Sequence, residues 1–445
     1  MQKERMISKQ HTVSLHQLAL CAYALMAFLL HLFSSSISTV AYCVIIILFA
    51  CGFAFSKPIF RNGLPRAYKF FWITAILVTL ANYLFRYSSN GVFIDVIVLF
   101  SGFIVILCFS GTPDCYNAAL SEVKAMSCFF AFGILLQVLA PFIYSAVIQL
   151  FPSGFRSSLA AGLSSAGKIK GFSTNPGFSA GYVIAGILAL YAGSRHSIRI
   201  RRRDKILFVL LLLSLLMTRK RAPFLFLILT IAIIHILPER GTKRLKKIWT
   251  FLMIALVIIV LFFLLQDALG QITFLKRLVV SIQSFMEGDD ITSGRSKLSA
   301  WAVKLFLQNP VTGIGWGFYR TTTRGNATLL KYLDVHNVYL QLLCETGLIG
   351  FIAFVTVFAV SWNMTKKSYC ACISTENPVL RKWKTPLLFS FAFQTYFLLY
   401  CLTGNPLYDQ FYQVLYSVSC SIAVAYRFVS RKYPYMTSGN TELMD

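Results

Sequence analysis

The chain has 445 residues, of which 57% are hydrophobic and only 13% are charged. Soluble domains are about half apolar and about a quarter charged, so this composition excludes an ordinary soluble protein and indicates a polytopic membrane protein. The formal net charge is +26, but the lysines and arginines cluster in short segments between apolar runs. This pattern is typical of membrane topology and not of a nucleic-acid-binding face, so we expect no nucleic-acid partner.

Apolar runs predict an all-α polytopic membrane protein with about 12 transmembrane helices. The first run is long enough to span a bilayer and is followed at once by a second, so we interpret it as a transmembrane helix and not as a secretory signal. The expected spans lie near residues 13–33, 38–56, 69–86, 92–110, 125–150, 178–193, 205–217, 222–238, 248–266, 347–363, 385–402 and 409–427.

Basic loops predict the orientation of these spans. Lysines and arginines follow the second, sixth, eighth, tenth and last expected spans, and all of these loops fall on one side of the membrane. The positive-inside rule makes that side cytoplasmic, and both termini lie on it. The segment 151–177 and the long polar segment 267–346 are then expected outside.

The long polar segment divides the chain into three expected regions. Residues 1–266 hold transmembrane helices one to nine, residues 267–346 form one large extracytoplasmic loop with short helices, and residues 347–445 hold the last three spans and a short cytoplasmic tail. Spanning a bilayer does not require such a loop, so we expect it to carry chemistry.

One cationic cluster opposes the predicted orientation. Arg219, Lys220 and Arg221 lie between the seventh and eighth spans, on the expected outer side. The cluster is either a tight hairpin whose cations reach lipid headgroups or an anion site at membrane depth. The cluster lies on the expected outer side, where the positive-inside rule disfavours cations, and this placement favours the anion site. Pro223 fits the first turn of a helix, which predicts that the eighth span begins directly after Arg221.

Inside the long loop, apolar residues at helical spacing predict an amphipathic helix that ends at Asn309-Pro310. It lies on the outer membrane face or packs against the bundle. Three glycines then predict a tight turn that lets the backbone approach another element. The apolar positions are Leu298, Trp301, Ala302, Leu305 and Phe306, and the glycines are Gly313, Gly315 and Gly317.

Two further side chains are candidates for the chemistry. His336 lies near an expected helix start, where the helix dipole favours a neutral imidazole that can accept a proton. Arg295 is a cation in the same loop. The pair Asp289-Asp290 lacks the spacing of metal-dependent sugar transferases, and the cysteines, including Cys370 and Cys372 in an expected cytoplasmic loop, lack zinc spacing.

These residues together resemble the bacterial O-antigen ligase/O-antigen polymerase superfamily. That family has a histidine followed after ten residues by a glycine, as His336 and Gly347 are spaced here, and an arginine followed after three residues by a leucine, as Arg221 and Leu225 are. The resemblance is specific over about residues 205–363. Further family-like segments are Thr292-Ser293-Gly294-Arg295 with Trp301, Asn309-Pro310, Gly313-Ile314-Gly315, Glu345-Thr346-Gly347 and Thr403-Gly404-Asn405-Pro406-Leu407-Tyr408.

The resemblance implies a GT-C-like membrane glycosyltransferase in the bacterial inner (plasma) membrane. Such enzymes take a glycan from undecaprenyl pyrophosphate and pass it to an acceptor hydroxyl, without cofactor or metal, in surface polysaccharide biosynthesis. Arg221 and Arg295 match the family's arginines and are expected to hold the pyrophosphate, assisted by Arg219 and Lys220. His336 matches the family's histidine and would activate or orient the acceptor hydroxyl, with inversion at the anomeric carbon.

The shared motifs leave the type of transfer open. A polymerase, which uses the next lipid-linked repeat unit as acceptor, is slightly favoured by the Lys-Arg form of the cationic cluster. A ligase would use lipid A–core as acceptor. A glycan flippase or anion transporter is the distant alternative, although no internal repeat supports it.

Overall fold

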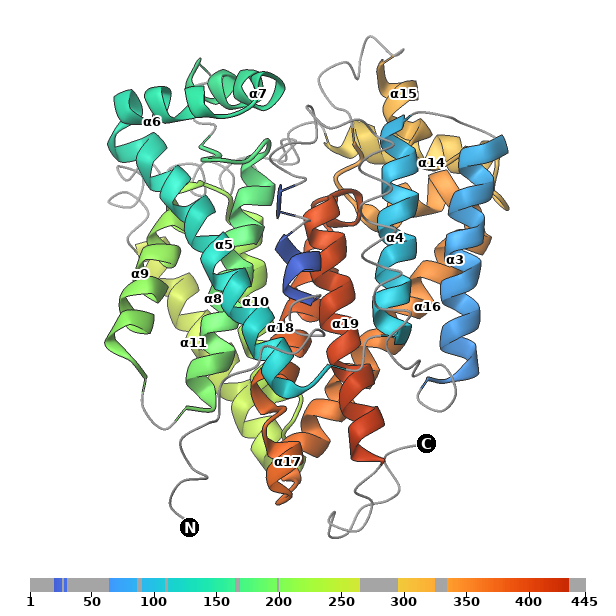
Figure 1. Ribbon diagram of the computed structural model, residues 1–445. Coiled ribbons are helices and arrows are strands. Elements are labelled where there is room, and N and C mark those ends of the chain that lie inside the picture. The colour runs from blue at the N-terminus through green and yellow to red at the C-terminus, as the bar shows by residue number, and fades with distance from the viewer. Residues whose placement is uncertain are drawn as a thin grey trace, which may run out of the picture.

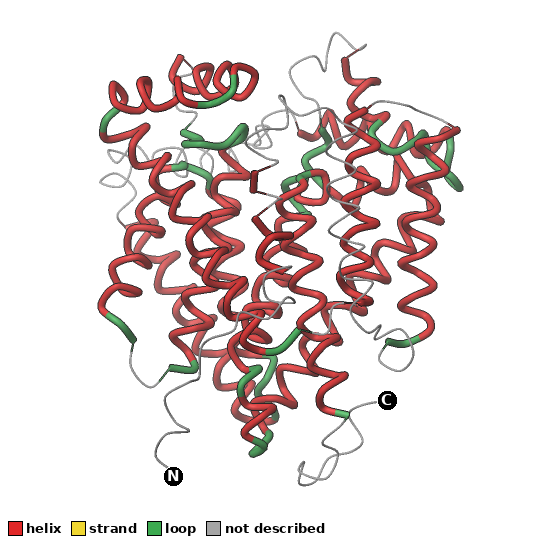
Figure 2. Tube along the Cα trace, viewed as in Figure 1, coloured by secondary structure: helices red, strands yellow, loops and turns green. Residues whose placement is uncertain are grey.

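The computed structural model describes residues 20–25, 28–29, 64–85, 90–108, 111–164, 169–197, 200–264, 295–324 and 334–431. All regular secondary structure in these residues is helical, as predicted. Figure 1 shows most of the helices side by side in one bundle, and Figure 2 shows loops mainly at its two ends. The expected spans near 13–33 and 38–56 lie mostly or wholly outside the described residues, as do Asp289-Asp290 and most of the loop before Arg295.

The long helices of the bundle run between its two ends. In chain order they are α3 (Arg66–Phe85), α4 (Asn90–Cys108), α5 (Pro113–Leu139), α8 (Pro176–Arg195), α9 (Arg202–Met217), α10 (Arg221–Ile236), α11 (Gly241–Leu264), α16 (Val338–Ser374), α18 (Lys384–Tyr400) and α19 (Gln410–Ser430).

Short helices cover the ends of the bundle. They are α6 (Pro141–Val147), η3 (Ile148–Leu150), α7 (Ser153–Ser164), α14 (Arg295–Gln308), α15 (Phe318–Arg324), α17 (Pro378–Arg381) and η4 (Pro406–Tyr408). In Figure 1, α6, α7, α14 and α15 lie at one end and α17 lies at the other. We call the end that carries α6, α7, α14 and α15 the loop end.

Four of the described helices are long and apolar enough to cross a membrane, namely α3, α5, α8 and α16. Shorter apolar helices span Val96–Leu107, Pro141–Leu150 and Arg221–Ile236. For the described residues, a helical fold with helices that can cross a membrane is therefore confirmed, whereas the number of about 12 spans and the side on which each loop lies stay predictions.

The bounds predicted for the fifth span, 125–150, were wrong. α5 begins at Pro113, where the Cys115 amide donates to the Thr112 hydroxyl at 3.4 Å, and it ends at Leu139. Pro141 then starts α6, because proline fits the first turn of a new helix but cannot continue the old one. The predicted span 125–150 therefore combined the second half of α5 with the separate short helices α6 and η3.

The tenth predicted span, 347–363, was too short. α16 starts at Val338 and continues to Ser374, with a break in its helical geometry at Gly347. Cys370 and Cys372 consequently lie within this helix and not in a loop. The Cys372 thiol is buried and donates to the Leu380 carbonyl at 3.1 Å, as expected of a packed core cysteine.

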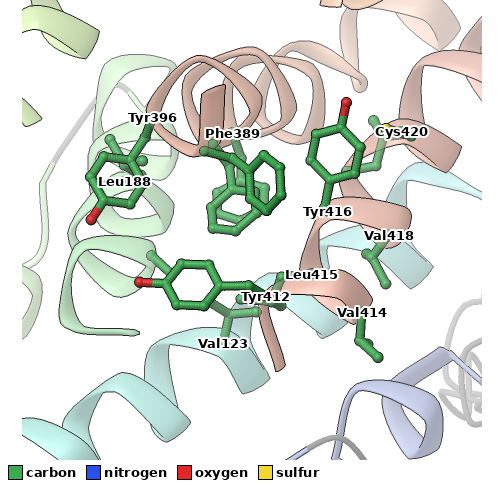
Figure 3. Close-up of a cluster of buried hydrophobic side chains, with 14 of the residues drawn as sticks. Val123, Leu188, Phe389, Tyr396, Tyr412, Val414, Leu415, Tyr416, Val418 and Cys420 are labelled. Atoms are coloured by element: carbon green, nitrogen blue, oxygen red, sulfur yellow. The ribbon is translucent and has the colours of Figure 1, made fainter. Parts of the chain in front are cut away.

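The core of the bundle is rich in aromatic rings from α18 and α19. Phe397 and Tyr416 have ring centroids 4.4 Å apart, which is close aromatic packing. Figure 3 shows Tyr396 of α18 and Tyr412 of α19 in this core together with Leu188 of α8 and Val123 of α5. Both α10 and α16 pack against α18, and the amide of Val338 at the start of α16 donates to the carbonyl of Cys401 just after α18.

Candidate active site

The cationic cluster forms the turn between α9 and α10. α9 ends at Met217, and the buried Thr218 accepts a hydrogen bond from the Lys220 amide at 3.3 Å. Arg219 has a positive φ of 56°, a conformation that is costly for a residue with a Cβ. α10 then begins at Arg221, one residue before the start that Pro223 predicted. The helix start adds positive potential to a turn that already carries three cations.

His336 lies in the segment that leads into α16. Asn337 caps that helix, with its side-chain oxygen accepting from the Leu340 amide at 3.1 Å. The next amide, that of Val338, donates to the Cys401 carbonyl at 2.8 Å. His336 itself has a φ of 58°. Among the described residues other than glycine, only His336 and Arg219 have a left-handed backbone. Both strained backbones belong to predicted site segments, where strain is most often found.

Arg295 is the first residue of α14 and is exposed. Its guanidinium Nη1 donates to the Thr403 carbonyl at 3.4 Å, which ties the start of α14 to the loop between α18 and α19. The apolar face of α14 is buried at Leu298, Ala302 and Leu305 and packs against α16. Of the two interpretations of this amphipathic helix, packing against the bundle therefore accounts for its buried face.

The electrostatic field at His336 connects three separate segments. Burial lowers the pKa of the His336 imidazole below its ordinary value, and the nearby cations Arg295 and Lys220 lower it further, against the opposite effect of Asp334. The imidazole is therefore neutral at neutral pH and free to accept a proton. The charges of Arg295 and Lys220 thus act on His336 from two other segments, and Arg219 and Arg221 flank Lys220 in its turn.

The break in α16 is held by the glycine-rich turn after α14. At a helix break, carbonyls before it and amides after it lose their helical partners. Here the Ile314 and Gly315 amides donate to the Cys344 and Glu345 carbonyls at 2.9 and 3.0 Å, and the Leu348 amide donates to the Pro310 carbonyl at 2.9 Å. The predicted close approach of this turn to another element is confirmed.

Glycine is required on both sides of this contact. Gly313 and Gly347 have φ values of 73° and 64°. A Cβ on Gly313 would lie 2.4 Å from the Glu345 carbonyl, and one on Gly347 would lie 2.3 Å from the Val311 carbonyl oxygen. The contact fixes the first turns of α16, and with them the segment that carries His336.

Gly347→Ala is expected to destabilise the protein more than Gly241→Ala. Left-handed backbone costs a residue with a Cβ about 1–2 kcal/mol, and the overlap with Val311 adds about 1–3 kcal/mol. Gly241→Ala is the matched control, since Gly241 has a φ of 56° but open space around its Cβ position. Thermal unfolding in detergent micelles should rank the midpoints as wild type, then Gly241→Ala, then Gly347→Ala. Equal midpoints for the two variants would contradict the close contact.

Several residues near the site gave no usable signal in the sequence. The Thr403 carbonyl meets Arg295, and Thr403 was noted only as part of a family-like turn. Asp334 and Arg320 form an ion pair at 2.6 Å between the His336 segment and α15, and neither belongs to a recognisable motif. Their proximity to His336 in the chain was the only available indication.

Comparison with known proteins finds a family similarity in the middle of the chain. Residues 206–355 match the family model described as O-antigen ligase. No curated protein matches the chain. The match contains Arg219, Lys220, Arg221, Arg295 and His336, so it covers both the cationic turn and the segment before α16. The predicted resemblance to the O-antigen ligase/polymerase superfamily is therefore confirmed for residues 206–355, and the match supports a membrane glycosyltransferase of that type.

Proposed function

We propose that this protein transfers a glycan from undecaprenyl pyrophosphate to the hydroxyl of an acceptor glycan, as a polymerase of lipid-linked repeat units. The observation that carries the proposal is the convergence of Lys220 and Arg295 on a His336 imidazole whose pKa is lowered. Such a site combines a proton acceptor with cations for a departing pyrophosphate. It calls for no metal or cofactor.

The reaction follows from these charges. As the acceptor oxygen attacks the anomeric carbon, its proton passes to the neutral imidazole of His336. The bond between the anomeric carbon and the pyrophosphate oxygen breaks on the opposite face, so the configuration inverts. Arg295 and Arg221 hold the pyrophosphate through paired N–H donors, and their fixed charge stabilises the negative charge that develops on it. Arg219 and Lys220 extend the cationic surface for the second phosphate.

The proposed site lies where a lipid-linked donor can reach it. We place the loop end outside a bacterial inner membrane, with both termini in the cytoplasm, in accord with the distribution of basic loops. Of the three regions of the chain, the loop 267–346 supplies Arg295 and His336, and the transmembrane region before it supplies Arg221. The pyrophosphate would then sit at headgroup level with its polyprenyl chain in the bilayer.

Ligation to lipid A–core is the alternative within the same chemistry. The matched family model is described as O-antigen ligase, and the Lys-Arg form of the turn at Arg219–Arg221 is the feature that favours a polymerase. The two activities differ in acceptor and not in the charged groups that act on the donor.

Deletion of the gene separates these activities. Loss of a polymerase should leave single repeat units attached to the surface acceptor, whereas loss of a ligase should leave full-length polymer on the lipid carrier. Electrophoresis of the surface glycan and mass spectrometry of the lipid-linked pool measure both products. A surface glycan and lipid-linked pool identical to wild type would contradict both activities.

A further inference from the structure

An ion pair lies directly beside the proposed proton acceptor. Arg320 of α15 donates from Nε to Oδ1 of Asp334 at 2.6 Å, and Asp334 precedes His336 by two residues. Both side chains are only partly exposed, at 40% and 22%, so solvent weakens the pair less than it would a surface pair. The pair anchors the start of the segment in which His336 adopts its positive φ.

Arg320 is in turn held from its other side. Its guanidinium carbon lies 5.9 Å from the centre of the Tyr408 ring, within the range of a cation–π contact. A further neighbour of that ring is Trp316, stacked at 4.8 Å. The Tyr408 hydroxyl donates to Oε2 of Glu345 at 2.7 Å, so the ring is fixed at its edge as well as by stacking.

Glu345 ties this chain of contacts to the helix that His336 leads into. It is fully buried in α16, and its Oε1 accepts from Nε2 of Gln341 at 3.2 Å. Gln341 also accepts from Nδ2 of Asn405 at 2.9 Å. These contacts therefore form one continuous chain. It runs from Glu345 of α16 to Tyr408 before α19, then to Arg320 of α15, and ends at Asp334, two residues before His336.

We infer that Asp334 and Arg320 are positioning residues for His336, with Tyr408 and Glu345 holding Arg320 in place. The left-handed backbone at His336 persists only if surrounding contacts over-determine it. The capping hydrogen bond of Asn337 fixes the segment on its helical side, and the Arg320–Asp334 pair fixes it on the other. The inference rests on the proposed role of His336 as proton acceptor.

The charges around His336 make the inference testable through the direction in which each variant shifts the His336 pKa. The charged groups that face the imidazole are Arg295 from α14, Lys220 from the turn before α10, and Asp334 from its own segment. Asp334 favours the charged imidazole, and Arg320 neutralises part of that effect. Asp334→Asn should therefore lower the pKa of His336, and Arg320→Gln should raise it, if the pair stays beside His336 as the structure places it.

The experiment is an NMR titration of the full-length protein in lipid nanodiscs with isotope-labelled histidine. The chain has six histidines, and loss of a signal in His336→Gln assigns the relevant one. We expect the two variants to shift the His336 titration in opposite directions. In parallel, glycan transfer to isolated lipid-linked repeat units is measured at alkaline pH, where His336 is neutral in every variant. Under these conditions the turnover of Asp334→Asn and Arg320→Gln should fall about 10²-fold, with little change in KM.

Two control variants and one further test variant keep the result interpretable. Arg203→Gln and Asp204→Asn alter another arginine–aspartate pair, 3.8 Å apart at the start of α9, and should change neither the titration nor the turnover. Tyr408→Phe removes only the hydroxyl bond to Glu345, so it tests the support of Arg320 if the ion-pair variants fail to fold. It should lower turnover about tenfold.

The outcomes separate this inference from the proposed function. The positioning role would be overturned if Asp334→Asn and Arg320→Gln left the His336 pKa unchanged or shifted it in the same direction. It would also be overturned if the turnover of these two variants stayed within about twofold of wild type, because a displaced catalytic group should cause a much larger loss. The titration requires no transfer reaction, so it stands even if the substrate is a different lipid-linked glycan. An active His336→Ala enzyme would instead refute the proposed function.

Discussion

Replacing His336 with alanine is expected to lower glycan transfer by about 10²–10⁴-fold, the usual contribution of a positioned general base. Burial and the cations Arg295 and Lys220 keep the pKa of the imidazole low, so the wild-type side chain is ready to accept the acceptor's proton at neutral pH. With alanine at this position, only water can accept the proton of the acceptor hydroxyl. Initial rates of glycan transfer in proteoliposomes, normalised to inserted protein, measure the effect.

A second histidine provides the matched control. His196 caps the C-terminal end of α8, at the other end of the bundle from the cationic turn, and the pKa of its imidazole is also lowered, mainly by burial. His196→Ala should therefore transfer glycan at the wild-type rate. If His336→Ala does so too, His336 has no part in the chemistry.

Arg295→Ala and Arg221→Ala are each expected to lower transfer by about 10²–10³-fold, because removing one preorganised donor to a developing negative charge has effects of this size. Lysine at either position should restore little activity, since its ammonium cannot donate two parallel hydrogen bonds to a phosphate. The release of undecaprenyl pyrophosphate, followed by thin-layer chromatography, measures the step in which these side chains act.

Lys304→Ala is the control for a general loss of positive charge. Lys304 lies on α14, the helix that Arg295 begins, and its ammonium rests over the Trp301 ring at 5.3 Å. This substitution removes the same charge from the same helix but should leave the release rate unchanged. A loss as large as that of Arg295→Ala would show that overall charge, and not the placement of Arg295, attracts the donor.

The local elements of the site could be predicted because each depends on neighbouring residues. Pro223 and Asn309-Pro310 predicted a helix start and a helix end, and the structure places the start within one residue and the end at Gln308. The glycines at 313 and 315 predicted a close backbone approach, which the amide bonds to Cys344 and Glu345 confirm. The family match confirms the resemblance built on these motifs.

The contacts between distant segments could not be predicted. Periodicity does not reveal that Gly347 breaks α16 or that residues 309–317 supply the missing backbone partners, because the signal is a backbone angle and not a pattern of side chains. The same holds for the Arg320–Asp334 pair, whose members are charged residues without a motif. The start of α5 was misplaced because its first turns are polar in sequence although Cys115 and Tyr116 are buried.

Reconstitution of the purified protein with lipid-linked repeat units from host membranes tests the central claim most directly. We expect wild-type protein to release undecaprenyl pyrophosphate in step with each new glycosidic bond, and to lengthen the lipid-linked glycan by whole repeats through an inverted linkage. His336→Ala should do neither. Release of the lipid pyrophosphate at equal rates by the wild type and His336→Ala would contradict the account.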